Sequence, residues 1–148
     1  MSILLENKKA YFDYEILEKF EAGLVLAGWE VKSLKNKRGN LAGSRAIIRG
    51  GEAFLVGLDI PLYQPTNIPK EAETQRTIKL LLRKKEIDYL EGKLSQKGLT
   101  MVSLKVYTKG RRVKVEIALV KGKKKHDKRE KIKKRETKRQ IERLIKRE

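Results

Sequence analysis

Hydrophobic and polar residues alternate along several stretches of the first 120 positions, which is the pattern of strands that bury one face. Between positions 11 and 22, five of the six even residues are apolar, against two of the six odd residues. This pattern predicts a strand over 11–22, and Gly23 predicts a bulge or a sharp bend at its end. Residues 100–107 and 112–120 alternate in the same way around a short turn and predict a hairpin.

Glycine and proline mark the turns between the other expected strands. Two β-rich runs within 44–60 flank Gly50-Gly51, the residue type that a tight hairpin turn needs at positive φ. Residues 61–76 hold all three prolines and show no periodicity, so they predict a surface loop. A further strand is expected over 77–82.

Two segments have helical spacing instead. Residues 84–98 place three aliphatic side chains on one face and end at Gly98, where a left-handed cap belongs. Residues 26–39 predict a shorter helix that Gly39 ends, with a strand over 25–31 as the alternative. We interpret Trp29 within it as a core residue, because tryptophan usually anchors packing; a stacking platform for bases is the alternative.

The expected elements define the fold class and the division of the chain. Short antiparallel strands that must hide their edges favour a closed barrel. We therefore predict a mainly β fold with short helices, an antiparallel β-barrel of the oligonucleotide-binding type over 1–120. Residues 121–148 hold 15 Lys or Arg against 5 Asp or Glu, with four large aliphatics and no aromatic. This tail is expected to be disordered when free and helical once a polyanion neutralises it.

The net charge of +18 indicates a polyanionic partner. Nucleic acid is favoured, because every phosphate that a lysine or arginine neutralises releases counterions. An anionic membrane is the competing polyanion, but the tail lacks the Trp or Phe that would anchor it, so no membrane partner is expected. The sequence has no 18-residue apolar run and no signal-peptide pattern, which predicts a cytoplasmic protein.

Catalytic and metal-binding chemistry is not expected. With one His, no Cys and no phosphate-binding glycine loop, the chain predicts no catalytic residue, no metal, no cofactor and no enzymatic activity. His126 is expected to be exposed, with stacking on a base as the alternative. Asp127 either pairs with Lys128 or Arg129, or it orients an arginine or accepts from a base.

Four segments resemble the SsrA-binding protein family, also called small protein B. They include FEAGLVLAGWEVKSL within 7–44, GEAFL at 51–55, KLLLRKKEIDYLEGKLSQKGLT at 79–100 and KGKKKHDKR within 118–129. The resemblance implies a non-enzymatic barrel that binds the tRNA-like domain of transfer-messenger RNA (tmRNA), stands in for the missing anticodon arm, and enters stalled bacterial ribosomes as a monomer. It also implies that the tail folds in the decoding site, against 16S ribosomal RNA, and runs as a helix along the empty messenger channel.

The resemblance and the neighbouring basic side chains give two groups of site residues. The group expected to face tmRNA is Asn7, Lys8, Lys9, Glu21, Lys32, Lys35, Asn40, Arg76, Lys79 and Leu81, the last through packing. The group expected to reach the decoding site and channel is Gly122, Lys123, Lys124, His126, Asp127, Lys128, Arg129, Leu144 and Ile145. The chain departs from the family pattern at Gly43-Ser44-Arg45, where Asp-Ser-Tyr is common, and at Ile78, where an arginine is common. A structural ribosomal protein or assembly factor that binds ribosomal RNA is the alternative function.

Overall fold

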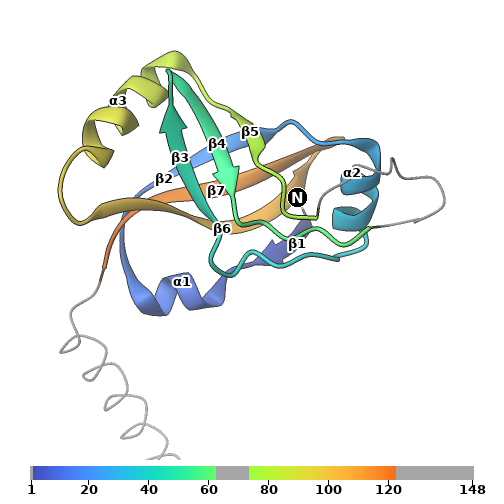
Figure 1. Ribbon diagram of the computed structural model, residues 1–148. Helices are drawn as coiled ribbons and strands as arrows, with labels where there is room; N and C mark the ends of the chain where they lie inside the picture. The colour runs from blue at the N-terminus through green and yellow to red at the C-terminus, as the bar shows by residue number, and fades with distance from the viewer. Residues whose placement is uncertain (1, 63–73, 123–148) are drawn as a thin grey trace, which may run out of the picture.

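Antiparallel strands and three helices form the part of the chain that the computed structural model describes, residues 2–62 and 74–122 (Figure 1). The strands are β1 Ser2–Glu6, β2 Tyr14–Leu24, β3 Arg45–Arg49, β4 Glu52–Val56, β5 Ile78–Leu81, β6 Leu99–Lys109 and β7 Arg112–Gly122. The helices are α1 Lys8–Asp13, α2 Gly28–Lys35 and α3 Lys84–Leu94.

Six of these strands close into a ring in the order β6-β3-β4-β5-β2-β7 and back to β6, and β1 adds to β6. Closure pairs the strand edges that would otherwise be exposed, and this confirms the predicted antiparallel barrel. Two register shifts allow the long strands to bend: one lies between Ile16 and Glu18 in β2, and the other between Ser103 and Lys105 in β6. The hairpin at Gly50-Gly51 forms as predicted, with both glycines at positive φ.

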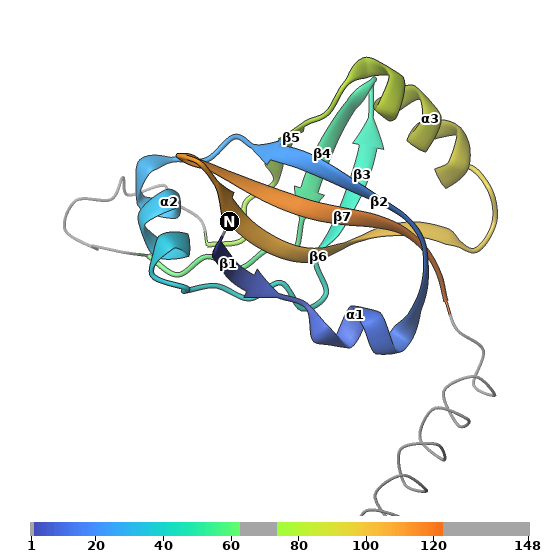
Figure 2. The same cartoon turned by 180° about the vertical axis from the view of Figure 1, so that it is seen from behind.

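The main core fills the barrel and is closed at its ends by helices. Inward side chains of the strands, such as Leu55 and Ile117, are fully buried. α3 and α2 lie on opposite sides of the barrel (Figures 1 and 2) and insert Leu90 and Leu34, both 0% exposed, into the same core. Trp29 is partly buried against this core, which confirms its interpretation as a packing residue.

A second, smaller core lies outside the barrel under α1. Ala10 of α1 packs with Leu104 of β6 and with Ala118 and Val120 of β7, positions that face away from the barrel interior. Figures 1 and 2 show α1 on the outer surface of the barrel, beside β6. The outward positions at this end of the long strands are therefore apolar because a helix covers them.

The structure corrects several expected boundaries. Residues 11–13 belong to α1 and not to the strand, because a buried Ala10 and a capping Asn7 hold this turn as a helix. Gly23 is no bulge: it pairs in register with both Leu81 and Lys114. β1 was not predicted. Both α2 and α3 end earlier than expected, so neither Gly39 nor Gly98 caps a helix.

Candidate nucleic-acid interface

Glu21 lies on the outer surface of β2, and both of its carboxylate oxygens accept hydrogen bonds. The Tyr107 hydroxyl donates to Oε2 at 2.5 Å, and Lys109 Nζ donates to Oε1 at 3.1 Å. The hydrogen bond from Tyr107, followed by that from Lys109, lowers the pKa of Glu21 below its ordinary value. Burial, followed by the same hydrogen bond, raises the pKa of Tyr107. Glu21 is therefore an exposed carboxylate fixed in its charged form, with lone pairs left to accept from a ligand.

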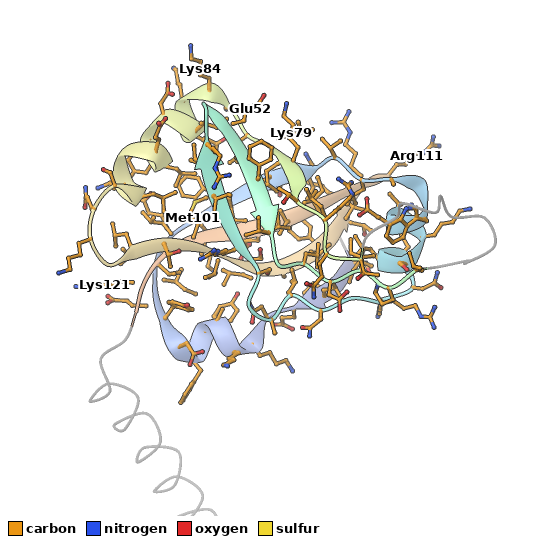
Figure 3. The ribbon with its side chains drawn as sticks, viewed as in Figure 1. Glu52, Lys79, Lys84, Met101, Arg111 and Lys121 are labelled. Atoms are coloured by element: carbon orange, nitrogen blue, oxygen red, sulfur yellow. The ribbon has the colours of Figure 1, made fainter. Side chains whose placement is uncertain are left out.

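Leu81 lies next to Glu21's strand and borders a groove of about 430 Å³. Its side chain is 55% exposed and rests on Gly23, where an added Cβ would approach Leu81 Cβ to 3.2 Å. The rim of the groove carries Arg111, Arg112 and Lys114. Figure 3 shows Arg111 at the β6–β7 turn, beside α2. The structure thus brings Glu21 and Leu81 into one region of the surface.

The three cations on this rim were not among the predicted site residues. Arg111 and Arg112 sit at and directly after the turn that contains Gly110, and Lys114 is opposite Gly23. The cluster TKGRRVK was visible in the sequence, but a hairpin turn with cations is common on any basic protein. Its position beside β2 depends on the register between β2 and β7, which the sequence does not reveal.

Lys32 and Lys35 are exposed on α2, whose Val31 lines the same groove. They are therefore available to a phosphate on the side of the molecule where Glu21 and Leu81 lie. Lys8 and Lys9 are exposed on α1, away from α2 in both ribbon views (Figures 1 and 2). Lys9 instead lines another groove, of about 570 Å³, together with Asn7, Tyr14 and Arg45 among others.

Asn7 is buried, and its side chain is occupied within the fold. Its Oδ1 accepts from the Ala10 N–H at 3.3 Å and caps α1, while Nδ2 donates to the carbonyls of Ser103 at 3.0 Å and Leu41 at 3.4 Å. Asn40 is exposed, pairs through its backbone with Asp59, and accepts from the Ala42 N–H through its side chain. Both asparagines thus use their side chains to order the backbone of this protein.

Arg76 also makes its main contacts inside the protein. Its guanidinium forms a two-point ion pair with the carboxylate of Glu30, which is 1% exposed. Nη2 lies 2.6 Å from Oε1, and Nε lies 2.9 Å from Oε2. Nη2 also donates to the Val25 carbonyl at 2.9 Å, and Nη1 donates to Thr77. Lys79 is exposed and pairs with Glu52 at 3.3 Å. Of these two predicted cations, Lys79 is the more available to a ligand.

The predicted tail residues divide at the end of β7. Gly122 is the last residue of this strand and pairs with Tyr14. It therefore belongs to the barrel, whereas the sequence predicted it to lie in the tail. The remaining tail predictions lie outside the described residues: Lys123, Lys124, His126, Asp127, Lys128, Arg129, Leu144 and Ile145. Most of the predicted loop 61–76 lies outside them as well.

Within residues 2–62 and 74–122, no three His, Asp or Glu side chains gather where they could hold a metal ion. No helix in these segments is both long enough and apolar enough to span a membrane.

A closed antiparallel β-barrel with cations around its surface grooves, in a chain of net charge +18, has the architecture of a nucleic-acid-binding β-barrel protein. The chain belongs to the SmpB protein family, whose model matches residues 4–147.

Relatives and a solved structure agree with this assignment. The chain is 51% identical to the SsrA-binding protein of Syntrophobacter fumaroxidans over 98% of this chain and 89% of the relative. It is 49% identical to that of Thermosipho africanus over 99% of both chains. It also superposes with a TM-score of 0.68, at 45% identity, on a chain of the structure “tmRNA-SmpB: a journey to the center of the bacterial ribosome”, covering 82% of this chain and 85% of that one.

Proposed function

We propose that this protein binds the tRNA-like domain of tmRNA and delivers it to stalled bacterial ribosomes, where trans-translation tags the nascent peptide and frees the ribosome. The observation that carries this proposal is the likeness to a chain solved in a tmRNA–SmpB assembly of the bacterial ribosome, at 45% identity over 82% of this chain. The relatives named SsrA-binding protein support the same partner. The protein acts in the cytoplasm as a binding adaptor, with no catalytic step of its own.

The surface around Glu21 and Leu81 is the proposed contact for the tRNA-like domain. The ionised carboxylate of Glu21 can accept hydrogen bonds from the N–H groups of nucleobases. Such a charge-assisted hydrogen bond is about twice as strong as a neutral one. The exposed Lys32 and Lys35 then supply phosphate contacts that set position and not sequence. Arg76 supports this surface through the fold, because it ties Glu30 of α2 to the Val25 carbonyl that follows β2. Asn7 and Asn40 contribute through the stability of the fold.

The basic tail is proposed to report that the messenger channel is empty. A segment with 15 cations against 5 anions, counted over 121–148, repels itself until phosphates surround it. We propose that it orders in the decoding site and continues as a helix along the channel. Messenger RNA in that channel would exclude it sterically.

A binding experiment tests the proposal. The protein is titrated with a tmRNA tRNA-like domain and with a ribosomal RNA hairpin of equal length, at two salt concentrations. An adaptor prefers the former, and the preference persists at higher salt because it rests on base and shape contacts as well as on charge. Equal affinities would instead identify a structural ribosomal protein or assembly factor.

Two variants assign the roles. Glu21→Ala is expected to weaken binding of the tRNA-like domain, whereas Glu15→Ala, a matched change at an exposed position of the same strand, leaves it unchanged. Deleting residues 123–148 is expected to preserve this binding and to abolish peptide tagging on stalled ribosomes. Loss of RNA binding on deletion would contradict the proposed division of roles.

A further inference from the structure

An aromatic side chain stands on the outward face of β3, β4 and β5. Phe54 occupies the middle of β4, with Ile47 opposite it on β3 and Lys79 opposite it on β5. Its strand neighbours Ala53 and Leu55 point into the barrel and are 0% exposed. Because successive strand residues face opposite sides, Phe54 points outward, where it is half-buried among its neighbours.

A shallow groove of about 400 Å³ lies over this aromatic ring. Ile47, Phe54 and Val56 line it together with Thr77, and Arg45 and Arg49 of β3 border it. Apolar surface of this kind flanked by cations fits the faces of nucleobases and the phosphates that join them. We call these six residues the Phe54 platform.

In the described part of the chain, the arginines of the platform form no ion pair. Among the residues that the structure describes, neither Arg45 nor Arg49 has a carboxylate within 4 Å or a hydrogen-bond acceptor. Glu52 lies directly opposite Arg49 in the β3–β4 register, but its carboxylate is paired with Lys79 at 3.3 Å, and Figure 3 shows Glu52 and Lys79 at neighbouring positions on β4 and β5. As far as residues 2–62 and 74–122 show, both arginines are therefore available to an anion.

We propose that the Phe54 platform binds single-stranded RNA, with a base stacked on Phe54 and phosphates paired with Arg45 and Arg49. The two arginines are four residues apart on one strand face, or roughly 13 Å, so they can hold separate phosphates of one short segment while a base between them lies on the ring. Guanidinium groups are suited to this role, because their planar fork pairs with phosphate at two points. A duplex does not fit, because its bases are stacked inside.

This site adjoins the tmRNA surface proposed above, because Lys79 and Leu81 share the outward face of β5 and Lys79 is opposite Phe54, but it does not include Glu21. Glu21 lies on β2, and β5 separates that strand from β4 in the barrel. An acidic, apolar peptide would be the competing occupant. RNA is favoured, because unpaired guanidiniums around an aromatic ring match alternating phosphates and bases on a chain of net charge +18.

The experiment uses the full-length protein and a single-stranded RNA octamer that carries 5-iodouridine, which cross-links to aromatic side chains under ultraviolet light. Mass spectrometry then locates the adduct, so binding by the basic tail does not mask the result. The adduct is expected on Phe54, and its yield against octamer concentration reports the affinity of this site alone. Adducts confined to other aromatic residues would overturn the proposal.

Variants test the two parts of the site. Phe54→Leu is expected to abolish the adduct at residue 54, and Phe54→Trp to restore it, which separates stacking from a loss of folding. Arg45→Gln with Arg49→Gln is expected to raise the half-saturating concentration about tenfold and to reduce the salt slope by about 1.4, since each single-strand phosphate contact contributes about 0.7. The charge-matched pair Lys85→Gln with Lys97→Gln, exposed on α3 and the turn after it, should change neither quantity.

The two proposals can fail separately. Glu21→Ala should weaken binding of the tRNA-like domain and leave the octamer adduct on Phe54 unchanged. If the adduct were also lost, or if the arginine pair had no more effect than the lysine pair, the platform would not be an independent RNA site. If Glu21→Ala left both the adduct and the affinity for the tRNA-like domain unchanged, only the proposed role of Glu21 would be contradicted.

Discussion

Tyr107 donates a hydrogen bond of 2.5 Å to Glu21, so a phenol that is 3% exposed on β6 fixes a carboxylate on β2 across the intervening β7. Lys109 holds the other oxygen from the same strand as Tyr107. Glu21 is thus oriented by two residues more than 80 positions away in the sequence. A long, flexible side chain on an exposed strand face would otherwise sample several rotamers.

Replacing Tyr107 with phenylalanine is expected to raise the pKa of Glu21 toward its ordinary value of 4.5, because the largest cause of the lowered pKa is removed. Carboxyl-detected NMR titration measures this directly. A carboxyl group whose pKa is lower in the folded protein than in the unfolded chain stabilises the fold at pH values above the unfolded pKa, and this contribution is lost as the pH falls. The difference in the free energy of unfolding between wild type and Tyr107→Phe should therefore narrow below pH 4.5. Tyr89→Phe is the control, because Tyr89 donates to Glu18 instead. An unchanged Glu21 pKa in Tyr107→Phe would contradict the assignment.

Replacing Arg76 with leucine is expected to destabilise the protein by about 2–3 kcal/mol, because it leaves the Glu30 carboxylate buried without its partner. The lower part of the usual range is appropriate, since the Arg76 side chain is 34% exposed. Urea unfolding measures the change. The double variant Glu30→Gln with Arg76→Leu should recover part of the loss. A cost below about 0.5 kcal/mol for Arg76→Leu would mean that water satisfies Glu30.

The alternation of residues predicted the barrel because one buried face leaves a period of two in the sequence. It failed at 11–13, where Asn7 and a small buried Ala10 impose a helix on residues that also fit a strand. Such a choice depends on Leu104 and Ala118, which cover Ala10 from far along the chain. The strand β1 was missed because the run Ser2–Glu6 is short and owes its structure to pairing with β6.

The candidate site was only partly predictable for the same reason. Glu21 could be placed on an outer face from its position between Phe20 and Ala22. Its hydrogen-bond partners could not be predicted, because they depend on the register of β2, β7 and β6. Arg76 was expected on the RNA surface as one of several cations, whereas the structure pairs it with Glu30, 46 residues away. The sequence therefore identified Arg76 as a cation, but the residue that it contacts is determined by the fold.

Replacing Asn7 with aspartate is expected to destabilise the protein by about 3 kcal/mol at pH 7, more than Asn7→Ala. The introduced carboxylate would still cap α1 but would face the carbonyls of Leu41 and Ser103, to which the amide now donates. Burial raises the pKa of such a group above its usual value of about 3.9, so the neutral form is favoured. Stability is therefore greatest at low pH and is lost as pH rises through the raised pKa. Thermal unfolding across pH 3–8 checks this; a cost independent of pH would contradict it.

Lys37 ends α2 in a left-handed conformation, with φ at 59°. The Arg38 N–H donates to the Ser33 carbonyl at 3.0 Å and the Lys37 N–H donates to Leu34 at 2.8 Å, the two bonds of a Schellman motif, which usually has glycine at this position. Lys37→Gly is expected to stabilise the protein by about 0.5–1 kcal/mol, because relief of left-handed strain exceeds the added entropy of the unfolded chain. Lys37→Ala, which removes the same charge but keeps the strain, serves as the control. If urea unfolding gave equal stabilities for the two variants, the left-handed backbone would not be the source of the effect.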